Sequence, residues 1–219
     1  MSLDHEASDS PDHRHGMTIP EEWTGPFDKR FWDDRYAEHT RVWSGNPNPH
    51  LVRVVEALDP GVALDIGSGE GADAIWLARH SWRVTATDIS SVALDRSAAA
   101  IAADGEVAAR IEWKQADVLE WAPPERSFDL VSSQYSHFPS ADLVPFVKRL
   151  AASVAPGGTL LVVAHEANGH SAMGPDYFVA AAKLAELLEP TDWTIVEAGL
   201  QQHPSREGSD EVLVARRLV

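Results

Sequence analysis

A short apolar run leads directly into a glycine-rich turn in the stretch Val62-Ala63-Leu64-Asp65-Ile66-Gly67-Ser68-Gly69-Glu70-Gly71. The apolar residues of Val62–Ile66 predict a buried strand, and the apolar spacing in Ala72–His80 predicts a helix after the turn. Glycines suit such a turn, because the chain reverses sharply and its backbone must approach a ligand closely. A strand, a glycine turn and a helix form the crevice at which open α/β sheets bind ligands.

The same two patterns alternate along the rest of the chain. Further strands are predicted at Arg83–Thr87, Arg110–Gln115, Phe128–Ser133, Thr159–Ala164, Thr194–Ala198 and Glu211–Arg216. Helices are predicted over Phe31–Glu38, from Leu51 to Leu58, from Leu94 to Ile101 with a close at Asp104-Gly105, from Leu143 to Val154, and from Phe178 to Leu188. We therefore predict an α/β fold with a doubly wound, mostly parallel sheet of seven strands. The last two strands lack a helix between them and are expected to form a C-terminal antiparallel hairpin.

The composition changes along the first part of the chain. Residues 1–24 are rich in Asp, Ser, His, Pro and Gly, and we interpret them as a mobile acidic tail. Their histidines could form a metal-binding tract, but a solvated tail is the simpler interpretation, and we predict no metal site. Aromatic residues are dense from Phe27 to Trp43, which predicts that residues 25–60 pack as a cap on the sheet core of residues 61–219, within one domain.

Charge and cysteine content exclude several classes of function. The 219 residues hold 18 Lys and Arg against 34 Asp and Glu, a net charge of −16, which disfavours binding to nucleic acids and to anionic membranes. The chain has no cysteine, so disulfides, thiolate metal sites and cysteine nucleophiles are excluded. No targeting or membrane-spanning segment is recognisable, and we expect a cytoplasmic protein.

Two classes of ligand compete for the glycine turn. Gly67, Gly69 and Ala72 fit the loose dinucleotide fingerprint, with Asp88 near the position of a ribose-binding carboxylate. Asp65, however, lies in the strand end two residues before the first glycine, and its carboxylate suits a cationic ligand group and repels a pyrophosphate. A cationic ligand is therefore favoured, and a nicotinamide-dependent oxidoreductase remains the alternative enzyme class.

Five short motifs follow in order along the predicted sheet: Asp65-Ile66-Gly67-Ser68-Gly69-Glu70-Gly71, Asp88-Ile89-Ser90, Ala116-Asp117-Val118, Phe128-Asp129-Leu130-Val131-Ser132-Ser133 and Pro156-Gly157-Gly158. In this order and spacing they resemble the class I S-adenosylmethionine-dependent methyltransferases. The wider region looks like the thiopurine and tellurite-resistance type of small-molecule methyltransferase. The resemblance implies a Rossmann-like fold, S-adenosyl-L-methionine as cofactor, and methyl transfer to an N, O or S atom of a small molecule.

The resemblance also implies which residues contact the cofactor. Asp65 is expected to face the amino group of its methionine part, directly or through water, and Asp88 to bind the ribose hydroxyls. Asp65 could instead cap the turn that follows it. Asp88 could instead be the N-cap of the following helix, a role that Ser90 could share. The remaining implied contacts come from Gly67, Ser68, Gly69 and Gly71 at the methionine part, Ile89, Ala116, Asp117 and Val118 at the adenine, and Ser133 and Gln134 beneath the methyl group.

We expect three segments to form the acceptor pocket: residues 30–49 of the cap, and residues 134–139 and 165–177, which follow two predicted strands. Arg41 and Trp43 belong to a segment that could cross the cofactor pocket, with Arg41 pairing with the methionine carboxylate. The alternative is a solvated Arg41 and a core Trp43. Tyr135, His137 and His165 are candidate pocket residues, and His137 is a candidate base. A thiolate or tertiary amine needs no base, so the lack of an evident base does not argue against an enzyme. A non-catalytic protein that binds S-adenosylmethionine is the alternative.

Overall fold

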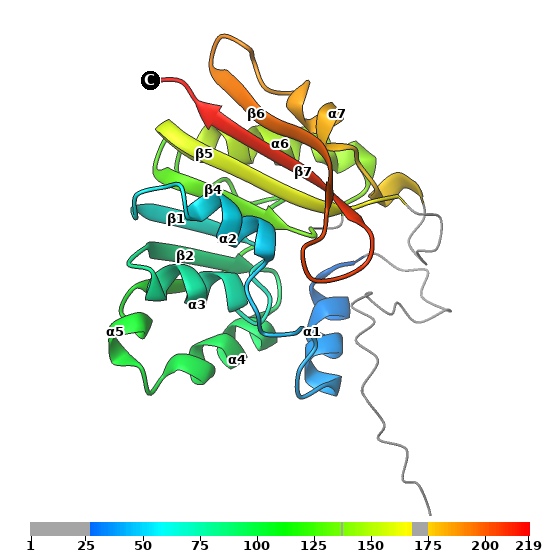
Figure 1. The fold of residues 1–219 in the computed structure, drawn as a ribbon. Coiled ribbons are helices and arrows are strands. Elements are labelled where there is room, and N and C mark those ends of the chain that lie inside the picture. The colour runs from blue at the N-terminus through cyan, green and yellow to red at the C-terminus, as the bar shows by residue number, and fades with distance from the viewer. Residues whose placement is uncertain (1–26, 137, 168–174) are drawn as a thin grey trace, which may run out of the picture.

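The computed structural model describes residues 27–136, 138–167 and 175–219, and its centre is a seven-stranded sheet (Figure 1). The strands are β1 (Val62–Ile66), β2 (Arg83–Asp88), β3 (Ile111–Gln115), β4 (Phe128–Gln134), β5 (Val154–His165), β6 (Trp193–Gln202) and β7 (Ser209–Arg217). Their order is β3-β2-β1-β4-β5-β7-β6, with parallel pairing from β3 to β5 and antiparallel pairing of β7 with both β5 and β6. The predicted fold class and C-terminal hairpin are confirmed.

Helices cover both faces of the sheet (Figure 1). They are α1 (Lys29–Glu38), α2 (Pro49–Val55), α3 (Ala72–Arg79), α4 (Ser91–Ile101), α5 (Gly105–Ala108), α6 (Ser140–Ser153) and α7 (Ala181–Ala185), with a 3₁₀ turn at Pro175–Tyr177. One apolar cluster joins α2, α3 and α5 to one face, where Leu51, Leu77 and Trp82 are almost completely buried. A second joins α6 and α7 to the opposite face through Phe146, Leu150 and Leu184. Each face thus carries its own core.

Two predicted helices differ from the observed ones. Asp104 and Gly105 do not end a helix: the Asp104 side chain accepts a hydrogen bond from the Val107 amide and caps the short helix α5. The predicted helix from Phe178 to Leu188 shortens to α7, since the amides of Leu187 and Leu188 bond to carbonyls three residues back, in a tighter turn. Leu188 is nevertheless buried as its apolar spacing predicted.

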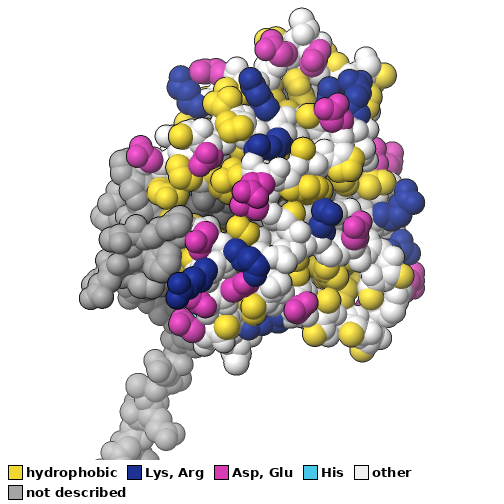
Figure 2. Space-filling model, turned by 180° about the vertical axis from the view of Figure 1, so that it is seen from behind, with side chains coloured by type: hydrophobic (Ala, Val, Ile, Leu, Met, Phe, Trp, Pro, Cys, Tyr) yellow, Lys and Arg dark blue, Asp and Glu magenta, His cyan; other side chains and the backbone are white. Residues whose placement is uncertain are grey.

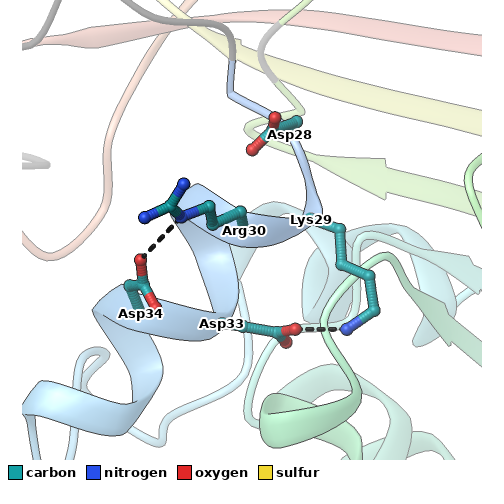
Figure 3. A pocket seen from close by; sticks show the side chains of 5 residues that line it. All are labelled: Asp28, Lys29, Arg30, Asp33 and Asp34. Carbon is teal, nitrogen blue, oxygen red and sulfur yellow. Dashed lines mark hydrogen bonds and ion pairs between the residues drawn. The ribbon is translucent and has the colours of Figure 1, made fainter.

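The helix α1 begins the cap and lies beyond the carboxyl ends of the parallel strands (Figure 1). Its inner side buries Phe31 and Tyr36, and the Phe27 and Phe31 rings meet edge to face at 5.0 Å. Its outer side carries charged residues around a shallow surface pocket (Figure 3). There Lys29 pairs with Asp33, and Arg30 Nε lies 3.7 Å from Asp34 Oδ2. Such i,i+4 pairs on a helix surface contribute only about 0.3–0.5 kcal/mol each, so we assign this pocket no ligand.

The surface is mixed in charge. On the face shown in Figure 2, the described Lys and Arg side chains are interspersed with Asp and Glu and form no continuous basic patch. Across residues 27–136, 138–167 and 175–219, no helix combines the length and apolarity that crossing a membrane requires.

Candidate active site

A cavity of about 550 Å³ opens at the carboxyl ends of β1, β2, β4 and β5. The glycine turn, the cap, the β4–α6 loop and the β6–β7 loop form its walls. The predicted site residues that line it are Trp43, Gly67, Ser68, Gly69, Asp88, Ile89, Ala116, Asp117, Val118, Gln134, Tyr135 and His165. Arg41, Asp65, Gly71 and Ser133 are absent from its walls, and His137 lies outside the described residues.

The glycine turn takes a backbone conformation that side chains disfavour. Gly67 and Gly69 have φ of +69° and +52°, in the left-handed region that L-residues rarely adopt. A Cβ on Gly69 would lie 2.9 Å from the Tyr36 hydroxyl and 3.2 Å from Trp43 Nε1. The cap therefore rests directly on the turn, and only glycine permits this approach.

Asp88 ends β2 with its carboxylate bound to two backbone amides. Gly69 N–H donates to Oδ2 and Ser90 N–H donates to Oδ1, both at 2.8 Å. The N-cap residue of α4 is Ser90, whose Oγ accepts a hydrogen bond from the Ala93 amide, so Asp88 is not the N-cap residue. Burial raises the pKa of Asp88, with the two amide bonds acting in the opposite direction. Each carboxylate oxygen has a second lone pair, which can accept from a ligand hydroxyl.

Asp65 lies behind the turn and is 1% exposed. One oxygen accepts from the Ala74 amide in the first turn of α3, and Oδ2 has no hydrogen-bond partner. Burial, followed by the nearby charges of Asp73 and Asp88, raises the pKa of Asp65 well above its ordinary value. The Asp65 carboxylate therefore binds an amide in the first turn of α3 and does not line the cavity.

Asp73 is an acid of the cavity wall that the sequence patterns did not single out. It stands in the first turn of α3, and its Oδ1 accepts from the Asn48 amide at 2.6 Å. Burial raises the pKa of its carboxyl to about 6. The available signal was an acid soon after the glycine turn, but acids are common at helix starts for reasons of helix dipole alone.

The predicted adenine side is apolar with one acid. Ile89 and Val118 line it, and Asp117 Oδ1 accepts from the Leu119 amide at 2.8 Å. This bond fixes the carboxylate at the loop and leaves its other oxygen available to an amine. Ser133, in contrast, is buried beneath the β4 end, where its Oγ bonds to Ser136 Oγ at 2.8 Å.

The opposite end of the cavity is organised by Asp210, a completely buried residue of β7. The Tyr135 hydroxyl donates to Asp210 Oδ2 at 2.9 Å, and Arg206 Nη2 donates to Oδ1 at 2.5 Å. His50 Nε2 lies 3.1 Å from Oδ2. Burial alone would raise the pKa of Asp210, but the bonds from His50 and Tyr135 and the charge of Arg206 lower it overall.

Tyr135 in turn positions His165. Their rings stack with centroids 4.3 Å apart, and Tyr135 has a φ of +52°, a strained value for a residue with a side chain. Burial, followed by the charge of Arg206, lowers the pKa of His165 to about 4. His165 is therefore a neutral imidazole at pH 7. His203, Ser205 and Arg206 were not predicted from the sequence, because they come from the polar β6–β7 loop, which carries no motif. Asp210, at the start of β7, was not predicted either.

The cap is held over the turn by Glu70. Its Oε2 accepts from the amides of Val42 and Trp43 at 3.1 and 2.9 Å, and its Oε1 from Arg96 at 2.8 Å. Trp43 Nε1 also donates to the Tyr36 hydroxyl at 2.9 Å, so Trp43 is part of the cavity wall. Arg41 instead is exposed and lies against Gly45, and it is not among the residues that line the cavity.

Comparisons with known proteins agree with this architecture. Residues 63–158 match a family model described as a methyltransferase domain. Uncharacterized methyltransferases of Mycobacterium tuberculosis and Mycobacterium bovis are 36% identical over 121 residues, which cover 54% of this chain and 59% of theirs. A probable thiol methyltransferase of Arabidopsis thaliana is 26% identical over 189 residues, 83% of this chain and 82% of that protein.

Solved structures share the fold. The N-methyltransferase NodS of Bradyrhizobium japonicum, in complex with S-adenosyl-L-homocysteine, superimposes with a TM-score of 0.67 at 21% identity, over 86% of this chain and 97% of that one. The magnesium protoporphyrin IX methyltransferase of Synechocystis, with the same ligand bound, gives 0.64 at 16% identity, with the same coverages. Residues 63–158 thus match a methyltransferase domain, and the chain shares the fold of class I S-adenosylmethionine-dependent methyltransferases and is similar in sequence to named methyltransferases.

Proposed function

We propose that this protein transfers the methyl group of S-adenosylmethionine to a small-molecule acceptor by in-line displacement. The observation that carries the proposal is the single cavity region shared by the glycine turn, Asp88 and the β4 end. The proposed cofactor contacts are Asp88 for the ribose, Ile89, Ala116, Asp117 and Val118 for the adenine, and the glycine turn for the methionine part. The sulfonium supplies its own leaving group, so the protein must chiefly orient the two reactants.

We infer that the acceptor atom is sulfur, with nitrogen and oxygen as alternatives. The Arabidopsis relative, which is named a probable thiol methyltransferase, supports this inference. So does the chemistry of the acceptor end, since an imidazole with a pKa of about 4 is a poor base and the Tyr135 proton is held by Asp210. A thiolate is already nucleophilic near neutral pH and needs no base of this kind.

Acidic residues argue against the dinucleotide alternative. Asp65, Asp73 and Asp88 surround the glycine turn, and burial raises the pKa of each. A pyrophosphate bound at this turn would add negative charge to three carboxylates, whereas a ligand with ammonium and sulfonium groups adds positive charge.

Thermal unfolding with different ligands tests the proposal. We expect S-adenosylhomocysteine to raise the melting temperature, because a ligand that binds only the folded protein stabilises it, and NAD(H) to leave it unchanged. A shift with NAD(H) alone would support an oxidoreductase instead. Absence of a shift with S-adenosylhomocysteine would contradict the proposed cofactor.

The acceptor atom is tested with thiophenol, phenol and aniline, which share one ring and differ in the nucleophile. We expect methylation of thiophenol by S-adenosylmethionine and much slower reaction of the other two. Preferential methylation of aniline or phenol would reject sulfur while retaining a methyltransferase. Cofactor binding without turnover on any of a broad acceptor panel would support a non-catalytic binding protein.

A further inference from the structure

We propose that Asp73, and not Asp65, presents the carboxylate that binds the α-ammonium group of the cofactor, an inference that rests on the proposed function. The two acids flank the same glycine turn, yet their side chains differ in direction. Asp65 is 1% exposed, and its carboxylate accepts a hydrogen bond from the Ala74 amide behind the turn. Asp73 belongs to the wall of the cavity.

The Asp73 carboxylate is held in one orientation. The Asn48 amide donates to Oδ1 at 2.6 Å, and Asn48 itself is fixed as the N-cap of α2 through a bond to the His50 amide. Within the part of the chain that the structure describes, Asn48 is the one residue that donates to Asp73. The second oxygen of Asp73 is therefore available to a ligand on the cavity side.

Positive charge is missing from this side of the cavity. Among the described residues, no Lys or Arg forms an ion pair with Asp65, Asp73 or Asp88. Buried carboxylates are normally paired with a cation, because burial without one penalises the charged form. Burial does raise the pKa of Asp73 to about 6, and its charge raises the pKa of Asp65. A cationic group of a ligand would complete this site.

Two buried polar atoms beside the turn also lack partners. These are Oδ2 of Asp65 and Oγ of Ser68, and Ser68 lines the cavity. Buried polar atoms are nearly always satisfied, so the unsatisfied Oγ of Ser68 at the cavity wall points to a bound polar group or ordered water. The atoms do not point to a metal, since no group of three His, Asp or Glu side chains in the described residues is arranged to hold one.

The two cationic groups of S-adenosylmethionine, the α-ammonium and the sulfonium, differ in the hydrogen bonds that they can donate. An ammonium offers three N–H donors to the free oxygen of a carboxylate, whereas a sulfonium offers none. Asp73 also lies beside Asn48 and the glycine turn, where the methionine part is proposed, while Gln134 marks the methyl end. The ammonium is therefore the group that Asp73 fits.

The experiment compares two ligands on one variant. S-adenosylhomocysteine carries the ammonium, and 5′-deoxy-5′-methylthioadenosine has the same nucleoside and thioether without the amino-acid part. Asp73→Asn keeps the shape and can still accept from the Asn48 amide, but it loses the charge. By calorimetry, we expect this variant to bind S-adenosylhomocysteine about 10- to 100-fold more weakly and to keep its affinity for methylthioadenosine within about twofold.

Matched variants make the test selective. Asp95→Asn removes an exposed acid of α4 outside the cavity and should change neither affinity, and Asp65→Asn should weaken S-adenosylhomocysteine less than Asp73→Asn does. The inference is overturned if Asp73→Asn leaves S-adenosylhomocysteine affinity unchanged, weakens both ligands equally, or has a smaller effect than Asp65→Asn. Absence of S-adenosylhomocysteine binding by the wild-type protein would overturn the proposed function as well, which distinguishes the two failures.

Discussion

The two ends of the cavity are built in different ways. The proposed cofactor end comes from residues that follow consecutive strands, from the glycine turn after β1 to Leu119 after β3. The proposed acceptor end combines the cap, the β4–α6 loop, the end of β5 and the β6–β7 loop, which are far apart in sequence. Strand order alone brings the first set together, while the second depends on contacts between separate parts of the chain.

The two ends also differ in charge. Asp65, Asp73 and Asp88 crowd the cofactor end without a described basic partner, and burial raises the pKa of each. At the acceptor end Asp210 is compensated by Arg206 and by hydrogen bonds from His50 and Tyr135. The charge of Asp210 at the acceptor end is thus compensated within the protein, whereas we propose that a cationic ligand compensates the acids of the cofactor end.

The largest effect is expected from Tyr36, which joins the cap to the cofactor end. Tyr36 is 2% exposed and lies against Gly69. We expect Tyr36→Ala to lower the free energy of unfolding by about 3–5 kcal/mol, as for other buried aromatic truncations, and to weaken S-adenosylhomocysteine binding. Urea unfolding and calorimetry measure both. Trp43 is 38% exposed, so Trp43→Ala should lower the free energy of unfolding clearly less than Tyr36→Ala does. An equal decrease for the two variants would contradict the anchoring role of Tyr36.

Asp88 tests the cofactor end by itself. We expect Asp88→Ala to weaken S-adenosylhomocysteine binding by about 1–3 kcal/mol, because a buried carboxylate that accepts from the ligand is lost. The Gly69 and Ser90 amides also lose their acceptor, so the melting temperature must be measured alongside the calorimetry. Unchanged affinity in a folded variant would show that the ribose binds elsewhere.

The uncompensated acids of the cofactor end predict that the stability of the unliganded protein depends on pH. Burial raises the pKa of Asp73 to about 6 from the ordinary 3.8, so the folded protein binds this proton more tightly than the unfolded chain does. The resulting stability is complete below about pH 4 and is lost as the pH rises through about 6. We expect the unfolding free energy of wild type, relative to Asp73→Asn, to fall by about 1–3 kcal/mol between pH 4 and 7.

Comparing the unfolding free energies of wild type and Asp73→Asn cancels the contribution of His165, which changes stability with pH in the opposite direction. The pKa of His165 is lowered to about 4, so His165 costs stability as the pH falls from about 6.5 towards 4, equally in wild type and variant. Urea unfolding at a series of pH values gives both curves. A difference that does not change with pH would mean that Asp73 is ionised in the folded protein throughout this range.

Glu70 tests how firmly the cap closes the cofactor end. We expect Glu70→Gln to lower the unfolding free energy by about 1–2 kcal/mol, because a charged acceptor of two amides and of Arg96 becomes neutral. Dissociation of S-adenosylhomocysteine, followed by stopped flow, should be faster. Glu106→Gln, at an exposed ion pair of α5, is the matched control and should change neither quantity.

Arg41 should show the smallest effect. Because it lies exposed against Gly45 and outside the cavity, we expect Arg41→Ala to change S-adenosylhomocysteine affinity by less than about 0.5 kcal/mol, the usual limit for surface substitutions. Calorimetry on the purified variant checks this. A loss of tenfold or more would instead restore the predicted pairing of Arg41 with the methionine carboxylate.

Sequence patterns predicted the sheet and the glycine turn well. The strand Val62–Ile66 was predicted to the residue, since a buried parallel strand reads as an uninterrupted apolar run ended by glycine. Helix lengths were less predictable, as α5 and α7 show, because capping and tight turns at helix ends depend on single hydrogen bonds. Most predicted cofactor residues line the cavity, because strand ends fix where their neighbours in sequence lie.

By itself, then, the sequence determined the strands, the C-terminal hairpin, the crevice at the glycine turn, and Asp65 and Asp88 beside it, since these follow from apolar periodicity and local backbone geometry. Only the tertiary structure decided that Asp73 lines the cavity and Asp65 does not, because Asp65 lies in β1 and Asp73 in the first turn of α3, on either side of the glycine turn. Likewise, it brought His50 to Asp210 across 160 positions of sequence. Contacts between distant segments arise from how the layers pack, and no local pattern of residues records that packing.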